Sequence, residues 1–600
     1  MFLSPGLSVF YLISVAILFS GLFLFKKSDR PLKSATWFIA SMMLFLCINV
    51  FAASIINLIH IPINLLTMGI FNCIAGGGLW FLILVKKQRQ RYTLELFDWV
   101  SVALIAGVAI TCGIIQFGTS LTPQYITSDP SVHMKMAMNI INTQSVSEMF
   151  FGPLNNALFM SIGMPFVHTL SAVKFFILSE FGMFALHGWV FYILINRFSK
   201  NLFTKIFSVV VTVLYMLGYP LNNMIFGYNY LGTGVTVLAF LLFLADAYYK
   251  REVHRRIVIP SLMLACLGLF LCYMLFMPFA YVALFLLVAW DYFQQKKLIT
   301  WEMVRTQLEI FLLPVIIGLI YCFFGWFGSA GAAGNAIAAE GYIYRDLYSN
   351  FIIWLPIALY GLIHSLKKKH WTALQPMSIL WFCFMIGLLV LGLNTKVSSY
   401  YYFKTYYVMW MITLALFYLG ITYFSEKSKE MVISYFLVWG FVATMFFSGT
   451  DAKVKEHNIL FNPEIRSDAQ FHIYLFNRYQ LQTATPSVTG EEFELYSYLL
   501  NHVDQTEQVP IADLEDTTYW YEALTNQRVY DQYFWLTDVK SWCKNIQENF
   551  NYVIIMNDCE KIQGQTEFLQ SLEIIYSNSA GYLAKTPKGT GSLNAIPAHS

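Results

Sequence analysis

Long apolar segments recur along this sequence from its first residues to about residue 449. Each of them is about 18 residues or longer with very little charge, which is enough to cross a hydrocarbon core about 30 Å thick. Only 12% of the 600 residues are charged, whereas a soluble protein contains about 25%. We therefore expect a polytopic α-helical protein of the lipid bilayer. Its net charge of +3 gives no reason to expect a nucleic-acid partner.

Hydropathy predicts about fourteen transmembrane helices. The predicted segments are 8–25, 36–58, 63–85, 98–117, 172–195, 204–219, 231–249, 257–275, 277–293, 308–327, 348–366, 376–393, 405–424 and 431–449.

Lysine and arginine concentrate in every second loop, such as Lys26–Lys33 and Lys86–Arg91. The positive-inside rule assigns these loops to the cytoplasm. The N-terminus, the loop 118–171 and the region after residue 449 are then expected outside the plasma membrane. The alternate set of loops between the helices is nearly free of positive charge, and its basic residues, which the rule does not require, are Lys135, Arg345, Lys396 and Lys404.

The composition divides the chain into three parts. Residues 1–449 form the predicted transmembrane domain, with surface helices in the outer loop 118–171. Residues 450–590 read as an extracytoplasmic α/β domain, and residues 591–600 as a disordered tail. In the second part, "EEFELYSYLLNHV" predicts a helix, and "QVPIADL", "NQRVYD", "NYVIIMND" and "LEIIYSN" predict strands. Cys543 and Cys559 could pair if this part is exported.

The outer loop contains the polar stretch "QYITSDPSVHMKMAMNII". Asp129 before Pro130 predicts a helix start, with Asp129 as the N-cap. The spacing of Val132, Met136 and Ile140 predicts one apolar helix face. His133 then lies one turn from Asp129, where it could orient the carboxylate or form part of a solvated face. Capping and catalysis are both open for Asp129, since one residue can do both.

Three further outer segments are rich in tyrosine. Segment 219–230 contains Tyr228, segment 328–350 contains Tyr342, Tyr344 and Arg345, and segment 394–410 contains Lys396, Tyr400, Tyr401 and Lys404. Tyrosine is common at the headgroup level of any membrane protein, so an interfacial belt is one interpretation. For Lys404, at the start of an otherwise uncharged helix, a phosphate partner is the better one.

An outward carboxylate, several cations and aromatic side chains fit sugar transfer from a lipid-phosphate donor. The carboxylate could take the proton of the acceptor hydroxyl. A cation could stabilise the charge that develops on the departing lipid phosphate.

With "SDPSVH" at 128–133 and "SSYYYFKTYY" at 398–407, the chain resembles the GT-C class of membrane glycosyltransferases, which use polyprenyl-phosphate sugars. The acidic loop follows about the fourth helix here, whereas it often follows the first in this class. There is no Asp-x-Asp motif, so no cofactor is certain and Mg²⁺ or Mn²⁺ stays an alternative. The acceptor that the resemblance implies is a cell-surface glycan or wall polymer.

The resemblance also implies the roles of individual residues. Asp129 would be catalytic, together with His133, and the donor phosphate would be bound by Lys404, Arg345 and Lys396. The sugar or lipid would contact Tyr342, Tyr344, Tyr400, Tyr401 and Tyr228.

Three other functions stay open. A polysaccharide polymerase or ligase acting on lipid-linked glycan would share the topology and the cations. A flippase or transporter would use Glu180 and His187, which lie seven residues apart on one face of an apolar helix, as coupling groups. A scaffold or receptor would use Asp129 only as a helix cap.

Overall fold

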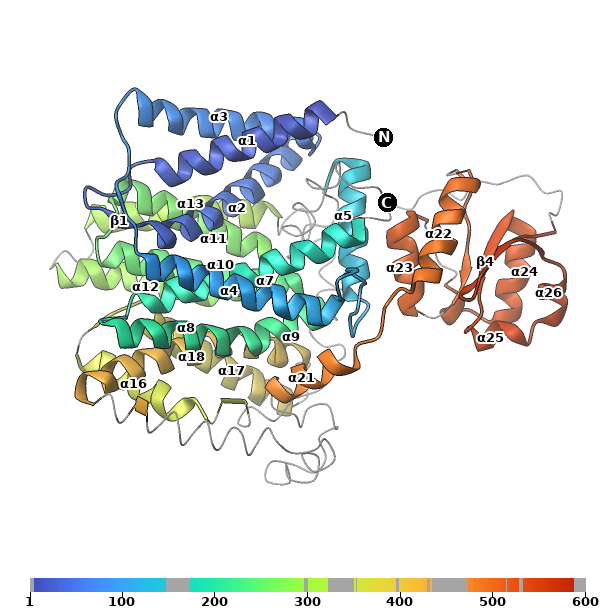
Figure 1. The fold of residues 1–600 in the computed structure, drawn as a ribbon. Helices are drawn as coiled ribbons and strands as arrows, with labels where there is room; N and C mark the ends of the chain where they lie inside the picture. Colours follow the sequence, from blue (N-terminus) through green and yellow to red (C-terminus); the bar gives the residue numbers. More distant parts are fainter. Residues whose placement is uncertain are drawn as a thin grey trace.

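A computed structural model gives the fold (Figure 1). It describes residues 5–146, 172–295, 300–321, 350–351, 353–368, 370–394, 399–428, 432–433, 473–504, 506–513, 515–527 and 533–587.

A bundle of long helices makes up most of the molecule, and a smaller unit with a sheet lies beyond one end of it (Figure 1). The bundle helices and their neighbours are α1 (Pro5–Leu24), α2 (Ser34–Leu58), α3 (Leu65–Leu84), α4 (Leu96–Phe117), α5 (Asp129–Thr143), α7 (Ala172–Asn196), α8 (Leu202–Leu217), α9 (Tyr219–Phe226), α10 (Asn229–Tyr249), α11 (Arg255–Cys272), α12 (Met277–Gln294), α13 (Trp301–Tyr321), α16 (Leu355–Lys367), α17 (Leu374–Leu393) and α18 (Ser399–Lys427).

Twelve helical segments of the described residues are long and apolar enough to cross a membrane, so the chain is a multi-pass membrane protein. They match twelve of the fourteen predicted segments. At predicted segment 348–366 the structure has α16, which has only 13 residues. Predicted segment 431–449 lies outside the described residues apart from 432–433. The outer loop expected at 219–230 is largely the helix α9. This helix extends the membrane span that begins with α8, so that the span ends at Phe226.

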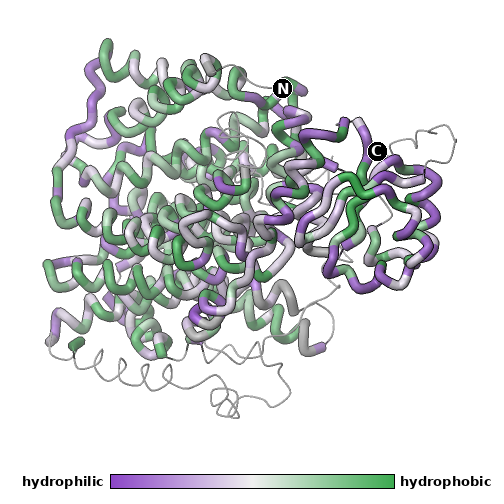
Figure 2. The backbone as a smooth tube through the Cα atoms, turned by 45° about the vertical axis from the view of Figure 1, so that its right-hand side comes forward, coloured by the Kyte–Doolittle hydropathy of each residue, from purple (hydrophilic) through white to green (hydrophobic). Residues whose placement is uncertain are grey.

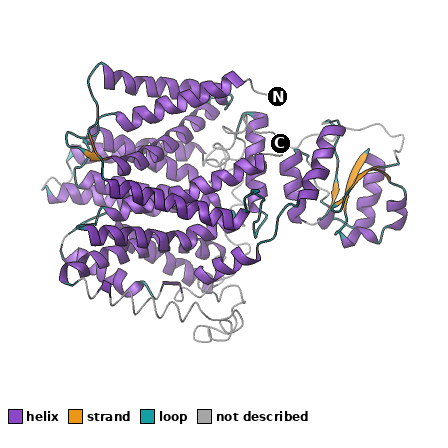
Figure 3. Cartoon of the chain, viewed as in Figure 1, coloured by secondary structure: helices purple, strands orange, loops and turns teal. Residues whose placement is uncertain are grey.

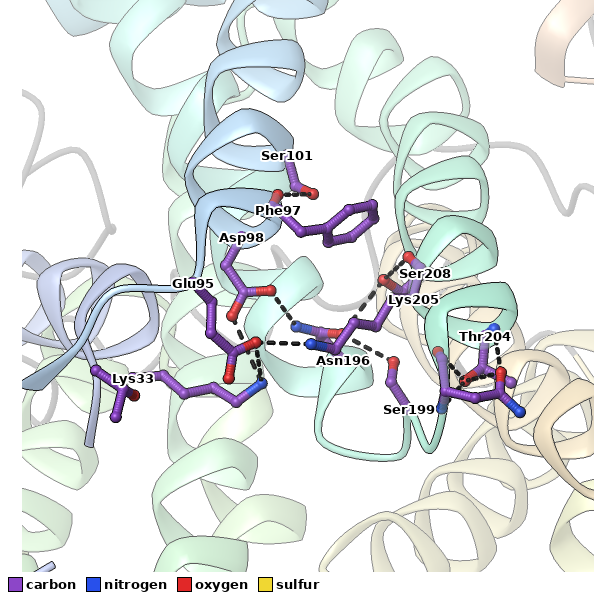
Figure 4. Close-up of polar contacts among 12 residues, drawn as sticks. Lys33, Glu95, Phe97, Asp98, Ser101, Asn196, Ser199, Thr204, Lys205 and Ser208 are labelled. Atoms are coloured by element: carbon purple, nitrogen blue, oxygen red, sulfur yellow. Dashed lines mark hydrogen bonds and ion pairs between the residues drawn. The ribbon is translucent and has the colours of Figure 1, made fainter. Parts of the chain in front are cut away.

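Ion pairs tie several loops together at one end of the bundle, which we call the basic end. Glu95 accepts from Lys33 at 3.1 Å and from Lys205 at 2.6 Å (Figure 4). Lys33 also lies 3.5 Å from Asp98, which accepts a hydrogen bond from Asn196 (Figure 4). Nearby, the two-residue strands β1 (Leu32–Lys33) and β2 (Tyr92–Thr93) pair in parallel. The opposite end, which carries α5, is called the α5 end.

The C-terminal unit contains a four-stranded sheet and short helices (Figure 3). The strand order is β3-β4-β6-β5, with β3 parallel to β4 and the other pairs antiparallel. Hydrophilic residues are frequent along its helices, in contrast to the bundle (Figure 2). Helix α21 (Ile473–Thr483) precedes this unit and packs on the bundle against α9 (Figure 1). The elements of the unit are α22 (Gly490–His502), β3 (Ile511–Ala512), α23 (Glu515–Thr525), α24 (Val539–Asn549), β4 (Tyr552–Met556), α25 (Glu560–Gln563), α26 (Thr566–Gln570), β5 (Glu573–Ser577) and β6 (Gly581–Lys585).

Three of the four strands predicted in this unit are present, as β3, β4 and β5. In "NQRVYD", residues 526–527 are not in a strand and the rest lies outside the described residues. The prediction missed β6, which pairs with β4 along all five of its residues. Cys543 and Cys559 are buried free thiols, so the structure does not pair them. The predicted tail 591–600 lies outside the described residues.

Two glycines bring the backbones of α16 and α18 into direct contact. A Cβ atom at Gly361 would overlap the carbonyl oxygen of Leu416, and one at Gly420 would overlap that of Ile357. Small residues permit this close approach of membrane helices, which gains van der Waals contact along the interface. Gly387 in α17 differs, because nothing lies within 4 Å of the position of its Cβ.

Gly420→Ala is therefore expected to lower the stability of the protein by about 1–3 kcal/mol, because the added methyl group pushes α16 and α18 apart. Thermal unfolding of the detergent-purified protein measures this loss. Gly387→Ala is the matched control and should be neutral or slightly stabilising, because alanine favours a helix. Equal stability of Gly420→Ala and wild type would contradict the close contact.

Candidate active site

The polar stretch quoted above forms the short helix α5 at the α5 end of the bundle. The helix begins at Asp129, and Ser128 occupies the N-cap position without a side-chain cap hydrogen bond. The prediction that Asp129 is the N-cap is therefore wrong. Its carboxylate is half-buried and accepts no hydrogen bond from any described residue. Without a cap hydrogen bond, what this carboxylate contributes to the helix is the attraction of its negative charge to the N-terminal end of α5.

The turn between α9 and α10 fixes the start of α5. The Thr127 hydroxyl donates to the carbonyl of Phe226 at 2.7 Å. Gly227 has a φ of +73° and packs so closely on Pro130 that any Cβ there would overlap the proline ring. Only glycine meets both conditions, since other residues rarely adopt such a φ. The sequence "FGY" thus sets where Asp129 lies.

The buried face of α5 differs from the predicted one. Val132 and Met136 are half-buried, and the fully buried positions are Pro130, Ser131, His133, Met134, Ala137, Met138 and Ile140. The apolar spacing was misleading because α5 packs between the bundle on one side and the C-terminal unit on the other. A helix with two covered sides has no single apolar stripe.

His133 lies on the side of α5 that faces the bundle. Its side chain is 7% exposed, it bonds to the backbone of Gly227, and its ring meets that of Tyr230 edge-on at 5.1 Å. Burial lowers the pKa of His133 to about 4, against the effect of the Gly227 bond and with that of the nearby Lys404 charge. The imidazole is therefore neutral at neutral pH.

Lys404, near the start of α18, meets the same tyrosine. Its side chain is 6% exposed, and its Nζ donates to the Tyr230 hydroxyl at 3.0 Å. The ammonium also lies 5.1 Å from the centre of the Tyr230 ring and 5.8 Å from that of Tyr273. Aromatic faces attract a cation and favour its retention at a poorly solvated position.

The charge of Lys404 also reaches Asp129. Burial raises the pKa of the Asp129 carboxyl, and the positive charge of Lys404 opposes this rise. No ion pair joins these two described residues directly. Asp129, His133 and Lys404 thus come together from two helices far apart in sequence, with Tyr230 of α10 in contact with both His133 and Lys404.

The other predicted site residues divide into three groups. Tyr228 lies at the edge of the cluster, half-buried, with its ring 6.5 Å from that of Tyr230. Tyr400 and Tyr401 belong to the first turn of α18, where only the backbone is described. Those outside the described residues are Arg345, Lys396, Tyr342 and Tyr344.

Sequence reasoning missed Tyr230, Tyr273 and Gly227. Tyr230 follows the predicted Tyr228 by two residues, and the residue pattern does not tell which of the two faces the bundle. Tyr273 directly follows α11, after a largely apolar run that gives no signal. Gly227 could have been suspected, because a glycine between two polar-aromatic segments often supplies a positive φ.

Glu180 and His187 lie in α7 and do not interact with one another. Glu180 Oε1 and His187 Nε2 are buried without a hydrogen-bond partner in the described part of the chain. His187 packs near Asn223 and Gly232 instead. Among the described residues, no group of His, Cys, Asp and Glu side chains could hold a metal ion, and this does not test the Mg²⁺ or Mn²⁺ alternative for the rest of the chain.

The buried neutral state of His133 predicts a pH-dependent stability. Between about pH 6.5 and pH 4 the unfolded chain binds a proton that the folded chain does not, so stability falls as the pH falls. The contribution of this residue is at most about 3 kcal/mol. His133→Gln should make the unfolding temperature less dependent on pH between about 7 and 4.5. The exposed His502→Gln should keep the wild-type dependence, and an unaltered profile in His133→Gln would contradict the burial.

No protein-family model matches the sequence, and no curated relative matches it. Among solved structures, the chain is similar to ArnT from Cupriavidus metallidurans bound to undecaprenyl phosphate, with a TM-score of 0.47 and 12% identity over 81% of this chain and 98% of that one. It is also similar to the Archaeoglobus fulgidus oligosaccharyltransferase, both in the apo form (TM-score 0.43, 11% identity, 76% and 69% covered) and tethered to an acceptor peptide (TM-score 0.43, 11% identity, 81% and 73% covered). At these identities and TM-scores the likeness assigns no function to this chain.

Proposed function

We propose that this protein is a GT-C type glycosyltransferase. It moves a sugar from a polyprenyl-phosphate donor to a cell-surface glycan or wall polymer. The observation that carries the proposal is the grouping of Asp129 and Lys404 at one end of the bundle. The carboxylate takes part in no hydrogen bond with a described residue, and its pKa is raised by burial.

The raised pKa of Asp129 suits a general base. A carboxylate with a higher proton affinity removes a hydroxyl proton more effectively as that oxygen begins to bond to carbon. In this reaction the acceptor oxygen attacks the anomeric carbon and its proton passes to Asp129. The bond between that carbon and the phosphate oxygen breaks, and its electron pair stays on the lipid phosphate.

Lys404 serves the leaving group. The phosphate gains negative charge as the glycosidic bond breaks, and a buried ammonium stabilises that charge more strongly than one in water. Its hydrogen bond to Tyr230 fixes the direction of the side chain. The half-buried Tyr228 offers an aromatic side chain for a sugar ring or the first isoprene unit. Arg345, Lys396, Tyr342, Tyr344, Tyr400 and Tyr401 remain predicted contributors.

The placement of charge supports an outward-facing reaction. The loops at the basic end contain most of the lysines and arginines of the bundle, which favours the cytoplasm for that end. The α5 end, the N-terminus and the domain 450–590 would then lie outside the plasma membrane. A polyprenyl-phosphate sugar presented at the outer surface would meet Asp129 and Lys404 there.

Asp129→Asn is expected to reduce transfer about 100-fold or more, because asparagine cannot take the acceptor proton. Cells producing the variant at the normal membrane level should lack one sugar of their surface glycan, as measured by glycan analysis. Asp558→Asn, at an exposed position of the C-terminal unit, is the control and should leave the glycan complete. An unchanged glycan in Asp129→Asn would contradict the proposal. Accumulation of single repeat units would identify a polymerase instead.

Lys404→Met is expected to weaken binding of undecaprenyl phosphate about 10-fold to 100-fold, because it removes a charge-assisted contact to the phosphate. Calorimetric titration of the purified protein in detergent measures the affinity. Lys427→Met, at the other end of the same helix, should bind like wild type. Equal affinities for wild type and Lys404→Met would assign the phosphate to another residue.

A further inference from the structure

The C-terminal unit contacts the helix that carries Asp129 and His133. Helix α23 packs directly against α5 (Figure 1). Across this contact Lys135 of α5 forms an ion pair with Glu522 of α23. The Glu522 side chain is 2% exposed and that of Lys135 is 38% exposed. The Tyr533 hydroxyl lies 3.4 Å from both oxygens of the same carboxylate. Lys135 thus neutralises a buried acid.

A second contact holds the segment before α5. The backbone N–H of Tyr125 donates to the Ser487 hydroxyl at 3.0 Å, and the N–H of Ser487 donates to the carbonyl of Pro123 at 2.7 Å. The ring of Tyr125 stacks on that of Trp520 in α23 at 6.1 Å. The C-terminal unit therefore binds the chain both before and after Asp129.

The buried position of Glu522 makes its pair with Lys135 more consequential than a surface ion pair. An exposed pair contributes little, because water solvates both partners once they separate. A buried carboxylate that loses its cation stays in a poorly solvating environment, which is strongly unfavourable. Separation of α5 from α23 must therefore either expose Glu522 or leave it without the Lys135 ammonium.

We propose that Lys135 and Glu522 are positioning residues, through which the C-terminal unit holds α5 and so places Asp129 and His133 beside Lys404. The consequence for catalysis rests on the proposed function, whereas the holding contact does not. The α9–α10 turn fixes the first turn of α5, and the ion pair fixes the helix one and a half turns later. Together they leave α5 little freedom to tilt.

Hydrogen exchange of the full chain in detergent tests the proposal. Lys135→Glu and Glu522→Lys should each raise the exchange rate of amides in residues 133–140 about tenfold or more, because each places like charges together. The charge swap carrying both substitutions should return the rate to within about threefold of wild type. Lys544→Glu, which breaks an exposed pair with Glu548 within α24, is the matched control and should leave α5 protected.

The chemical reactivity of His133 gives a second readout that needs no substrate. Diethyl pyrocarbonate modifies accessible neutral imidazoles, so the buried His133 should react slowly in wild type and several-fold faster in each single variant. The charge swap should restore the slow rate. If charge reversal prevents folding, Lys135→Met and Glu522→Gln replace it. The first should loosen α5 more than the second, because it leaves a buried acid while the second leaves a partly exposed lysine.

Unchanged exchange and reactivity in the single variants would overturn the proposal, as would loosening that the charge swap does not reverse. The proposed function is tested apart from this. If Asp129→Asn leaves the glycan complete while the charge swap restores the protection of α5, the enzyme assignment fails and the holding contact stands.

Discussion

A membrane bundle confines ionised side chains to its ends, because the hydrocarbon between them solvates charge poorly. The two ends of this chain meet the constraint in different ways. At the basic end Glu95 and Asp98 are matched by Lys33 and Lys205, and the loops are tied together as a result. At the α5 end Lys404 is kept among tyrosine rings, and Asp129 remains without a hydrogen bond from the described residues. The charged groups of the basic end are paired with one another, whereas no ion pair joins the Asp129 carboxylate to a described residue.

The position of that second cluster depends on a few backbone contacts. Gly227 packs on Pro130 and bonds to His133, while Thr127 bonds to Phe226. Helix α10 begins directly after this turn and supplies Tyr230, whose hydroxyl reaches Lys404. One turn between two helices thus sets the relative positions of an acid, an imidazole and an ammonium that are distant in sequence.

Hydropathy identified the membrane helices well, because each span is a long and uniform signal. At the predicted span 348–366 the helix α16 begins only at Leu355, after a turn at Ile353 and Trp354 of which hydropathy gives no sign. Asp-Pro and the residues after it correctly predicted that α5 is a helix. The predicted N-cap role of Asp129 and the predicted buried face of the helix were wrong. Both features depend on contacts of α5 with the C-terminal unit and with the α9–α10 turn. The spacing of residues within α5 carries no information about these contacts.

Tyr230 and Tyr273 could not be singled out from the sequence, because their place beside Lys404 arises only from helix packing. β6 was missed because its partner strand, and not its own composition, makes it a strand.

The glycine contact between α16 and α18 has a consequence for how far α18 can move on its own. Because Gly361 and Gly420 bring the two backbones together, α18 shifts only if α16 shifts with it. Helix α5 is held differently, by the fit of Pro130 on Gly227, by hydrogen bonds and by the ion pair of Lys135 with the buried Glu522. Lys404 therefore lies on a helix whose backbone is fixed against that of a neighbour, whereas the place of Asp129 depends on side chains of the C-terminal unit as well.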